Sequence, residues 1–176
     1  VRTKSSSLDS YVFLLIKQGG DTLYNSTVGA ITGSPLSLKP GNYTIEVYNE
    51  AFTEPAFDKP YYYGMQTAEV IGGESCEVLL ICKQENAGIR VLFSEEFSGQ
   101  YTTFSMNISG TGGSLKFDNT SVSKWGYFFP GTITLTLTAD GFPTEPIERT
   151  IQAKYMYNFL VEGSGSTKDN VEPVLT

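Results

Sequence analysis

The stretch PGNYTIEV at residues 40–47 returns as PGTITLTL at residues 130–137, ninety positions further along the chain. In both copies a Pro-Gly turn precedes residues that alternate between apolar and polar, a pattern typical of a half-buried β-strand. The same alignment brings Phe52 opposite Phe142. Chance is the alternative, since Pro-Gly before a strand is common, but the extended match favours two copies of one β-module.

The rest of the chain carries the same β signal. Its apolar runs alternate or are rich in β-branched and aromatic residues, and Gly- and Pro-containing turn signals separate them. Seven runs are predicted as strands: 11–17, 43–49, 76–83, 89–94, 103–109, 132–139 and 157–162. After the two long copies of the repeat, we expect residues 67–71 to pair with 76–83, and 148–153 with 155–162. Helical spacing is not sustained anywhere, so the sequence predicts an all-β fold built from antiparallel strands.

The two copies predict two domains. The break falls at the polar segment KQENAG, residues 83–88, which lies between strong strands. This gives an N-terminal domain over 1–84 and a C-terminal domain over 85–176. The second domain ends in a predicted flexible tail, residues 163–176, which begins with the linker-like sequence GSGS.

Composition excludes several classes of function. The formal net charge is −7 and Lys/Arg residues are not clustered, which argues against nucleic acid and against an acidic lipid surface. The chain has no His and only two Cys, so we expect no structural zinc and no cofactor. Asp118 with Asn119 is too little for a calcium loop. Without His for a triad or a G-x-S-x-G motif, we expect no enzymatic activity.

The two cysteines, Cys76 and Cys82, fall in the predicted strand 76–83. Six positions along a strand span roughly 20 Å, which is too far for a disulfide. Their even spacing places both on one face, so we expect buried free thiols.

Aromatic residues are the candidate ligand-binding groups. Tyr61, Tyr62 and Tyr63 are consecutive, and Trp125 precedes a second aromatic run, YFF at 127–129. Flat rings with hydroxyl groups can stack on sugars and hydrogen-bond to their edges. The alternative is structural: in a strand Tyr61 and Tyr63 share one face and Tyr62 takes the other, as half-buried aromatic residues commonly do.

Three motifs together resemble a family of Bacteroidetes surface lipoproteins that carry a domain of unknown function and are fimbrillin-like in style. These motifs are GNYTIEV (41–47), KPYYYG (59–64) and SCEVLLICKQENAGIRVLFS (75–94), and the resemblance spans residues 8–161. It implies two tandem β-sandwiches of transthyretin-like or immunoglobulin-like type. It also implies a lipidated Cys upstream of Val1 that anchors the protein on the outer membrane. The only expected membrane contact is through that anchor, with the protein at the cell surface or in the periplasm.

We therefore expect a non-catalytic surface lipoprotein with a structural or adhesive role, as a stalk or presentation module. Its expected partners are surface glycans or other surface proteins. One alternative is a carbohydrate-binding protein that uses the exposed aromatic residues, and another is a fimbrial subunit. Asp21-Thr22-Leu23 resembles the short O-glycosylation signal of the same bacterial group, which makes Thr22 a candidate modification site.

Overall fold

The computed structural model describes residues 8–33 and 35–163, and they form two compact units. Unit 1 holds the residues up to Ala51 together with Tyr61–Gln84, and unit 2 holds Phe52–Pro60 together with the residues from Glu85 onward. The segment 52–60 thus comes from the predicted N-terminal domain but belongs to unit 2, and the chain passes between the units three times. Of the predicted tail, residues 163–176, all but Gly163 lie outside the described residues.

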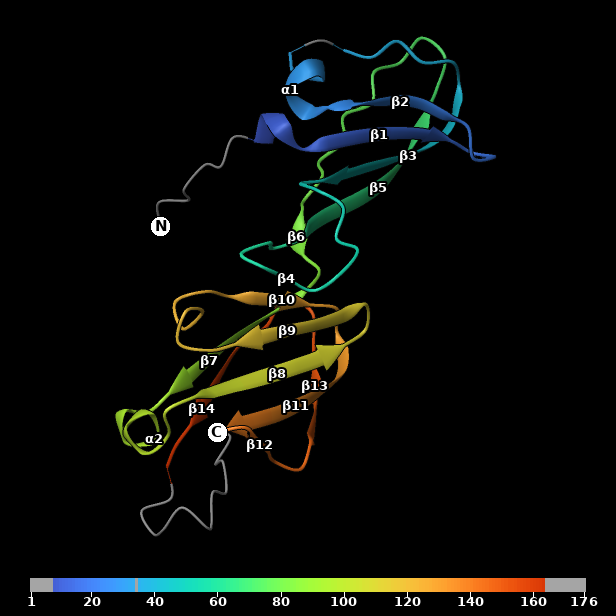
Figure 1. The fold of residues 1–176 in the computed structure, drawn as a ribbon. Helices are drawn as coiled ribbons and strands as arrows, with labels where there is room; N and C mark the ends of the chain where they lie inside the picture. The colour runs from blue at the N-terminus through green and yellow to red at the C-terminus, as the bar shows by residue number, and fades with distance from the viewer. Residues whose placement is uncertain (1–7, 34, 164–176) are drawn as a thin grey trace. The chain divides into compact units, whose positions relative to one another are not determined.

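Unit 1 is built on one five-stranded sheet with the strand order β2-β1-β3-β5-β6 (Figure 1). All of its strand pairs are antiparallel. Its elements are the 3-10 helix η1 (Leu8–Ser10), β1 (Val12–Lys17), β2 (Thr22–Thr27), the short helix α1 (Val28–Ile31), β3 (Gly41–Tyr48), β5 (Tyr62–Val70) and β6 (Lys83–Gln84).

Unit 2 contains two sheets (Figure 1). One has the order β14-β7-β10-β4, and the other has the order β12-β11-β8-β9 with β13 also paired to β11. The elements are β4 (Ala56–Phe57), β7 (Ala87–Phe93), helix α2 (Glu95–Gln100), β8 (Phe104–Gly110), β9 (Gly113–Phe117), β10 (Gly126–Phe128), β11 (Gly131–Ala139), β12 (Phe142–Pro143), β13 (Ile147–Ile151) and β14 (Met156–Val161).

The two Pro-Gly turns have a conformational reason. Gly41 begins β3 with φ 148° and Gly131 begins β11 with φ 136°, and side-chain-bearing residues rarely adopt this backbone conformation. The strands that follow are central in their sheets. The order β2-β1-β3-β5 of unit 1 recurs in unit 2 as β9-β8-β11-β13.

One hydrophobic core lies between the two sheets of unit 2. Ile89 and Val91 of β7 contribute to it from one sheet, and Ile108 of β8 and Leu135 of β11 contribute from the other; each is at most 1% exposed. Burial alternates along β11, as expected for a strand with one buried face. The structure is thus mostly β, and its described residues also form one 3-10 helix and two short α-helices.

The covered face of the unit 1 sheet has a smaller core, centred on Phe13, Leu15, Tyr43 and Val47. No second sheet covers that face among the described residues of unit 1. The covering is instead made by α1 and by irregular chain before β3 and before β6.

Two expected strand pairings are wrong. Residues 76–82 form no strand, because they cross the face of the sheet rather than joining its edge: the backbone of Ile81 lies directly over Gly64 of β5. In unit 2, β14 pairs in parallel with β7 and not with β13. That position buries Phe159 and Val161 of β14 in the core between the sheets.

The environments of the two cysteines follow from the irregular path of residues 76–82. Cys76 is exposed and Cys82 is partly buried, and both are free thiols. The expectation of two buried thiols on one strand is wrong: neither cysteine lies in a strand, and the irregular segment leaves Cys76 at the surface. Only Cys82 packs against the core of unit 1, where its thiol contacts the Val47 carbonyl oxygen at 3.6 Å.

Candidate functional site

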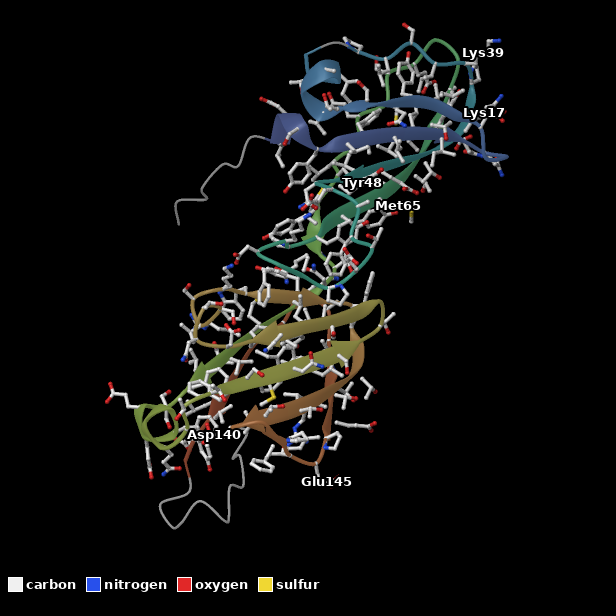
Figure 2. The ribbon with its side chains drawn as sticks, in the orientation of Figure 1. Lys17, Lys39, Tyr48, Met65, Asp140 and Glu145 are labelled. Carbon is white, nitrogen blue, oxygen red and sulfur yellow. The ribbon has the colours of Figure 1, made fainter. Side chains whose placement is uncertain are left out.

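The tyrosine triplet lies at the start of β5 in unit 1. Tyr62 packs against the core, and its backbone N–H donates to Asn49 Oδ1 at 2.8 Å. The rings of Tyr61 and Tyr63 stack with their centroids 6.2 Å apart and 28° between their planes. Tyr63 pairs across the sheet with Tyr48, which is labelled with Met65 in Figure 2. The structure thus brings Tyr61 and Tyr63 together and turns Tyr62 into the core.

Trp125 belongs to unit 2 and directly precedes β10. The loop before it is organised by Asp118, whose Oδ1 accepts hydrogen bonds from the Thr120 backbone N–H (2.8 Å) and hydroxyl (2.7 Å). These hydrogen bonds hold the pKa of the Asp118 carboxyl below its ordinary value. Ser121, only 4% exposed, donates its hydroxyl to the Asp118 carbonyl oxygen. The loop is therefore a compact turn, and its hydrogen bonds fix the conformation of the chain before Trp125.

Asp58 fixes the backbone of Trp125 from the segment 52–60. The Asp58 N–H donates to the Trp125 carbonyl oxygen at 2.7 Å, and the Trp125 N–H donates to Asp58 Oδ1 at 3.2 Å. Asp58 has φ 56°, a left-handed conformation that Asp tolerates better than most residues. Both polar groups of the Trp125 backbone are thus held by one residue.

Arg90 holds the ring of Trp125. Its guanidinium carbon lies 4.8 Å from the centroid of the Trp125 ring, which is a cation–π contact. The Arg90 Nε donates to Asn158 Oδ1 at 3.1 Å, and the two residues are register partners in the parallel pair of β7 with β14. Trp125 and Arg90 are partly buried, whereas Asn158 is exposed.

We call Trp125, Arg90 and Asn158 the Trp125 cluster. It lies on the outer face of the sheet, because Ile89 and Val91 on either side of Arg90 point into the core. The cluster offers a ring held from its backbone and its face, with amide and guanidinium groups beside it. Such a surface can contact a flat ligand and donate hydrogen bonds to it.

The sequence predicted Trp125 but not its partners. Alternation around Ile89 and Val91 indicates that Arg90 points outward from its strand. The contact of Arg90 with Asn158 depends on the parallel pairing of β7 with β14, which no local sequence pattern predicts. Asp58 was missed because it looks like an ordinary turn residue.

Unit 1 contains a separate feature, a groove of about 630 Å³ over the covered face of its sheet. The floor includes Leu15, Tyr43 and Val47, and Val78 and Leu80 form part of one wall. Most of the lining residues are apolar, with Ser37, Glu74 and Ser75 among the others, so the groove can accept apolar side chains.

The remaining predicted sites give smaller findings. Thr22 is the exposed first residue of β2, an edge strand, and its modification stays a prediction. In the part of the chain that the structure describes, no three His, Cys, Asp or Glu residues are grouped to hold a metal ion. Nor does any helix in that part have the length and hydropathy to span a membrane.

Three solved structures of Bacteroides proteins align with this chain. A candidate polysaccharide-binding protein (DUF1812) of Bacteroides thetaiotaomicron aligns with a TM-score of 0.59 at 11% identity, over 91% of this chain and 85% of that one. A candidate cell adhesion protein of the same species aligns at 0.47 and 15% identity, over 94% and 84%. A candidate adhesin of Bacteroides ovatus aligns at 0.49 and 10% identity, over 92% and 83%. At these identities the likeness concerns the fold alone.

A comparison with curated proteins gives no match. Residues 5–168 match a family that is described as a domain of unknown function, and this range covers nearly the whole chain. The protein therefore belongs to the DUF4493 family.

Proposed function

We propose that this protein is a non-catalytic cell-surface protein whose role is adhesive, and that it contacts glycans through the Trp125 cluster. The observation that carries the proposal is the double hold on Trp125: Asp58 binds its backbone at both polar groups and Arg90 covers its ring. An aromatic ring that is already fixed loses little conformational entropy when a ligand binds to it.

The comparison with solved structures also supports a glycan-binding role, because the structure that aligns with a TM-score of 0.59 is a candidate polysaccharide-binding protein of a Bacteroides species. Anchoring through a lipidated Cys upstream of Val1 completes the proposal, with unit 1 and unit 2 presented outside the outer membrane. Tyr61 and Tyr63 are a second aromatic surface, but Tyr62 packs against the core of unit 1 and so is the weakest of the predicted ligand contacts.

A glycan array followed by titration calorimetry tests the proposal. We expect Trp125→Ala to abolish binding, while Phe142→Ala leaves it unchanged. Phe142 is the matched control because it is 79% exposed and belongs to the other sheet of unit 2. Full binding by Trp125→Ala, or an array without a single bound glycan, would overturn the proposal.

The groove in unit 1 favours a second candidate function, that of a fimbrial subunit. Leu80 and Cys82 pack against the core, while Leu79 and Ile81, which alternate with them along the chain, are 82% and 65% exposed. This in-and-out alternation is that of a β-strand, yet residues 76–82 have no strand partner in the described structure.

Unit 2 indicates what such a partner would be. There the strand after β13 is β14, and it pairs in parallel with β7, which is the first long strand of that unit. Residues 76–82 occupy the equivalent position after β5 in unit 1, and no described strand of unit 1 stands in the place of β7. A strand from another subunit that fills this place would complete unit 1 as a second two-sheet sandwich.

Subunit ladders on a denaturing gel of unheated protein test the second candidate. We expect Val78→Arg to remove the ladders, because Val78 lines the groove, and Leu79→Arg to keep them, because Leu79 is on the other side of the same segment. A protein that stays monomeric at every concentration is not a fimbrial subunit.

A further inference from the structure

Arg90 is a cation without an acidic partner among the described residues. The chain holds 19 Asp and Glu but only 12 Lys and Arg, so carboxylates are in excess. Even so, the guanidinium of Arg90 lies over the Trp125 ring and donates to the neutral amide of Asn158 rather than to a carboxylate among the described residues. A partly buried guanidinium is more often paired with a carboxylate, and this one keeps its terminal nitrogens available.

The hydrogen-bonding groups of the Trp125 cluster are one-sided. Arg90 carries only donors, and so does the indole of Trp125. The single side-chain acceptor of the cluster is Asn158 Oδ1, and it already accepts from Arg90 Nε. The side chains of the cluster therefore offer a ligand mainly donors, the Arg90 terminal N–H groups and the Asn158 amide N–H groups, with the Asp58 carboxylate beside the Trp125 backbone as the nearby acceptor.

A site whose side chains are mainly hydrogen-bond donors selects among sugars. A neutral hydroxyl both donates and accepts, so it satisfies only part of its capacity here, whereas an ionised carboxylate only accepts. The guanidinium fork matches a carboxylate with two parallel hydrogen bonds, and such charge-assisted bonds are about twice as strong as neutral ones. Because Nε is occupied by Asn158, the two terminal nitrogens remain as the fork for the ligand.

We propose that the Trp125 cluster recognises a carboxylate-bearing sugar, such as a uronic acid unit of a polysaccharide, with the carboxylate on Arg90 and the sugar ring beside Trp125. This inference rests on the proposed glycan-binding function and names its ligand class. The net charge of −7 repels a polyanion at long range, so recognition depends on the local contact of the carboxylate with Arg90. Polyanions that cannot make this contact are disfavoured by the negative charge of the protein.

Titration calorimetry with three polysaccharide probes tests the inference: polygalacturonate oligomers, the same oligomers as methyl esters, and dextran sulfate. Esterification removes the negative charge and leaves the sugar ring. We expect the acid to bind about tenfold more tightly than the ester. Equal affinities overturn the inference. Tighter binding of dextran sulfate than of the acid also overturns it, because a sulfate is then the preferred anion.

Two variants locate the effect. Arg90→Gln should reduce binding of the acid about tenfold and leave binding of the ester unchanged, and Arg90→Lys should fall between because it keeps the charge but loses the fork. Unchanged acid binding in both variants overturns the inference. The ester comparison needs no variant, so a variant that fails to fold does not remove the test.

The two proposals fail differently. Suppose that Trp125→Ala abolishes binding of a neutral glycan and that substitution of Arg90 changes no affinity. The glycan-binding function is then supported, and the preference for an acidic sugar is wrong. If no probe and no array glycan binds, the glycan-binding function itself is wrong.

Discussion

Asp58 and Trp125 exchange two hydrogen bonds: the Asp58 N–H donates to the Trp125 carbonyl oxygen at 2.7 Å, and the Trp125 N–H donates to Asp58 Oδ1 at 3.2 Å. The residues are 67 positions apart. This contact joins the segment 52–60 to the loop that leads into β10, next to the pairing of β4 with β10. The position of the candidate ligand-binding ring therefore depends on a segment from the first half of the chain.

Two substitutions of Asp58 should separate its role as a hydrogen-bond acceptor from its tolerance of a left-handed backbone. Asp58→Ala loses the side-chain acceptor and places a residue with a Cβ but no local hydrogen bond at φ 56°, so we expect a loss of about 1–2 kcal/mol in the free energy of unfolding. Asp58→Asn keeps a carbonyl acceptor and tolerates the left-handed backbone, so its loss should be about 1 kcal/mol smaller. Urea unfolding measures both, and equal losses would contradict the assignment.

Phe57 should stabilise unit 2 although it lies in the first half of the chain. Its ring contacts the fully buried Phe117 edge-on at 5.1 Å between centroids. We expect Phe57→Ala to reduce the stability of unit 2 by about 2–3 kcal/mol. The sole tryptophan, Trp125, lies in that unit, so its fluorescence reports the transition. Leu79→Ala, at an 82% exposed position of unit 1, is the control and should leave this transition in place.

Two glycines should respond to alanine in opposite directions. A Cβ on Gly126 would lie 2.6 Å from Phe117 Cζ and 2.8 Å from Leu115 Cδ1, so Gly126→Ala should cost about 1–3 kcal/mol through overpacking. A Cβ on Gly99, in α2, would meet nothing within 4 Å, and Gly99→Ala should add roughly 0.5–1 kcal/mol through helix propensity. Denaturant midpoints followed by Trp125 fluorescence compare the two variants, and a neutral Gly126→Ala would show that β10 and β9 are less closely packed.

The two thiols should react at different rates. Burial raises the pKa of Cys82, so less of it is thiolate at a given pH and its alkylation should be slower than that of exposed Cys76. Mass spectrometry of Cys76→Ser and Cys82→Ser during iodoacetamide treatment at about pH 8 measures each rate. The rates should converge in denaturant. A faster Cys82 in the folded protein would place that residue outside the core of unit 1.

Asp118 should make stability depend on acid pH. Its pKa is lowered in the folded state, first by the Thr120 hydroxyl and then by the Thr120 N–H, so its contribution is present above the unfolded pKa of about 3.9 and is lost as pH falls through the lower folded pKa. We expect Thr120→Ala to move the Asp118 pKa upward in an NMR titration. The stability difference between the two proteins should shrink below about pH 4. An unchanged pKa would mean that the Thr120 hydroxyl is not its principal cause.

Local patterns predicted the parts of the fold that local physics decides. Alternation indicated β11 and β3, and the Pro-Gly turns marked where each begins, because a positive φ at Gly41 and Gly131 is a property of the residue itself. The strand-like segment 76–83 was wrong for the opposite reason. Its in-and-out alternation is real, but a strand also needs a partner for its backbone, and sequence alone does not say whether one is present.

The candidate site was predictable only at its centre. Trp125 stands out as the sole tryptophan, and the alternation of the tyrosine triplet correctly separates Tyr62 from Tyr61 and Tyr63. Asp58 and Asn158 reach the cluster through pairings across 67 and 68 positions, which depend on tertiary structure. No spacing rule connects such residues before the sheets are known.

The three passages of the chain between the units set an order of assembly during synthesis. All strands of unit 1 have been synthesised once Gln84 is added, whereas β4 pairs with β10, which follows it by some seventy residues. The loop between β3 and β5 thus contains β4, whose partner strand is synthesised later. A chain divided after residue 84 would carry β4 on the fragment that lacks β10, so neither fragment would hold all the strands of unit 2.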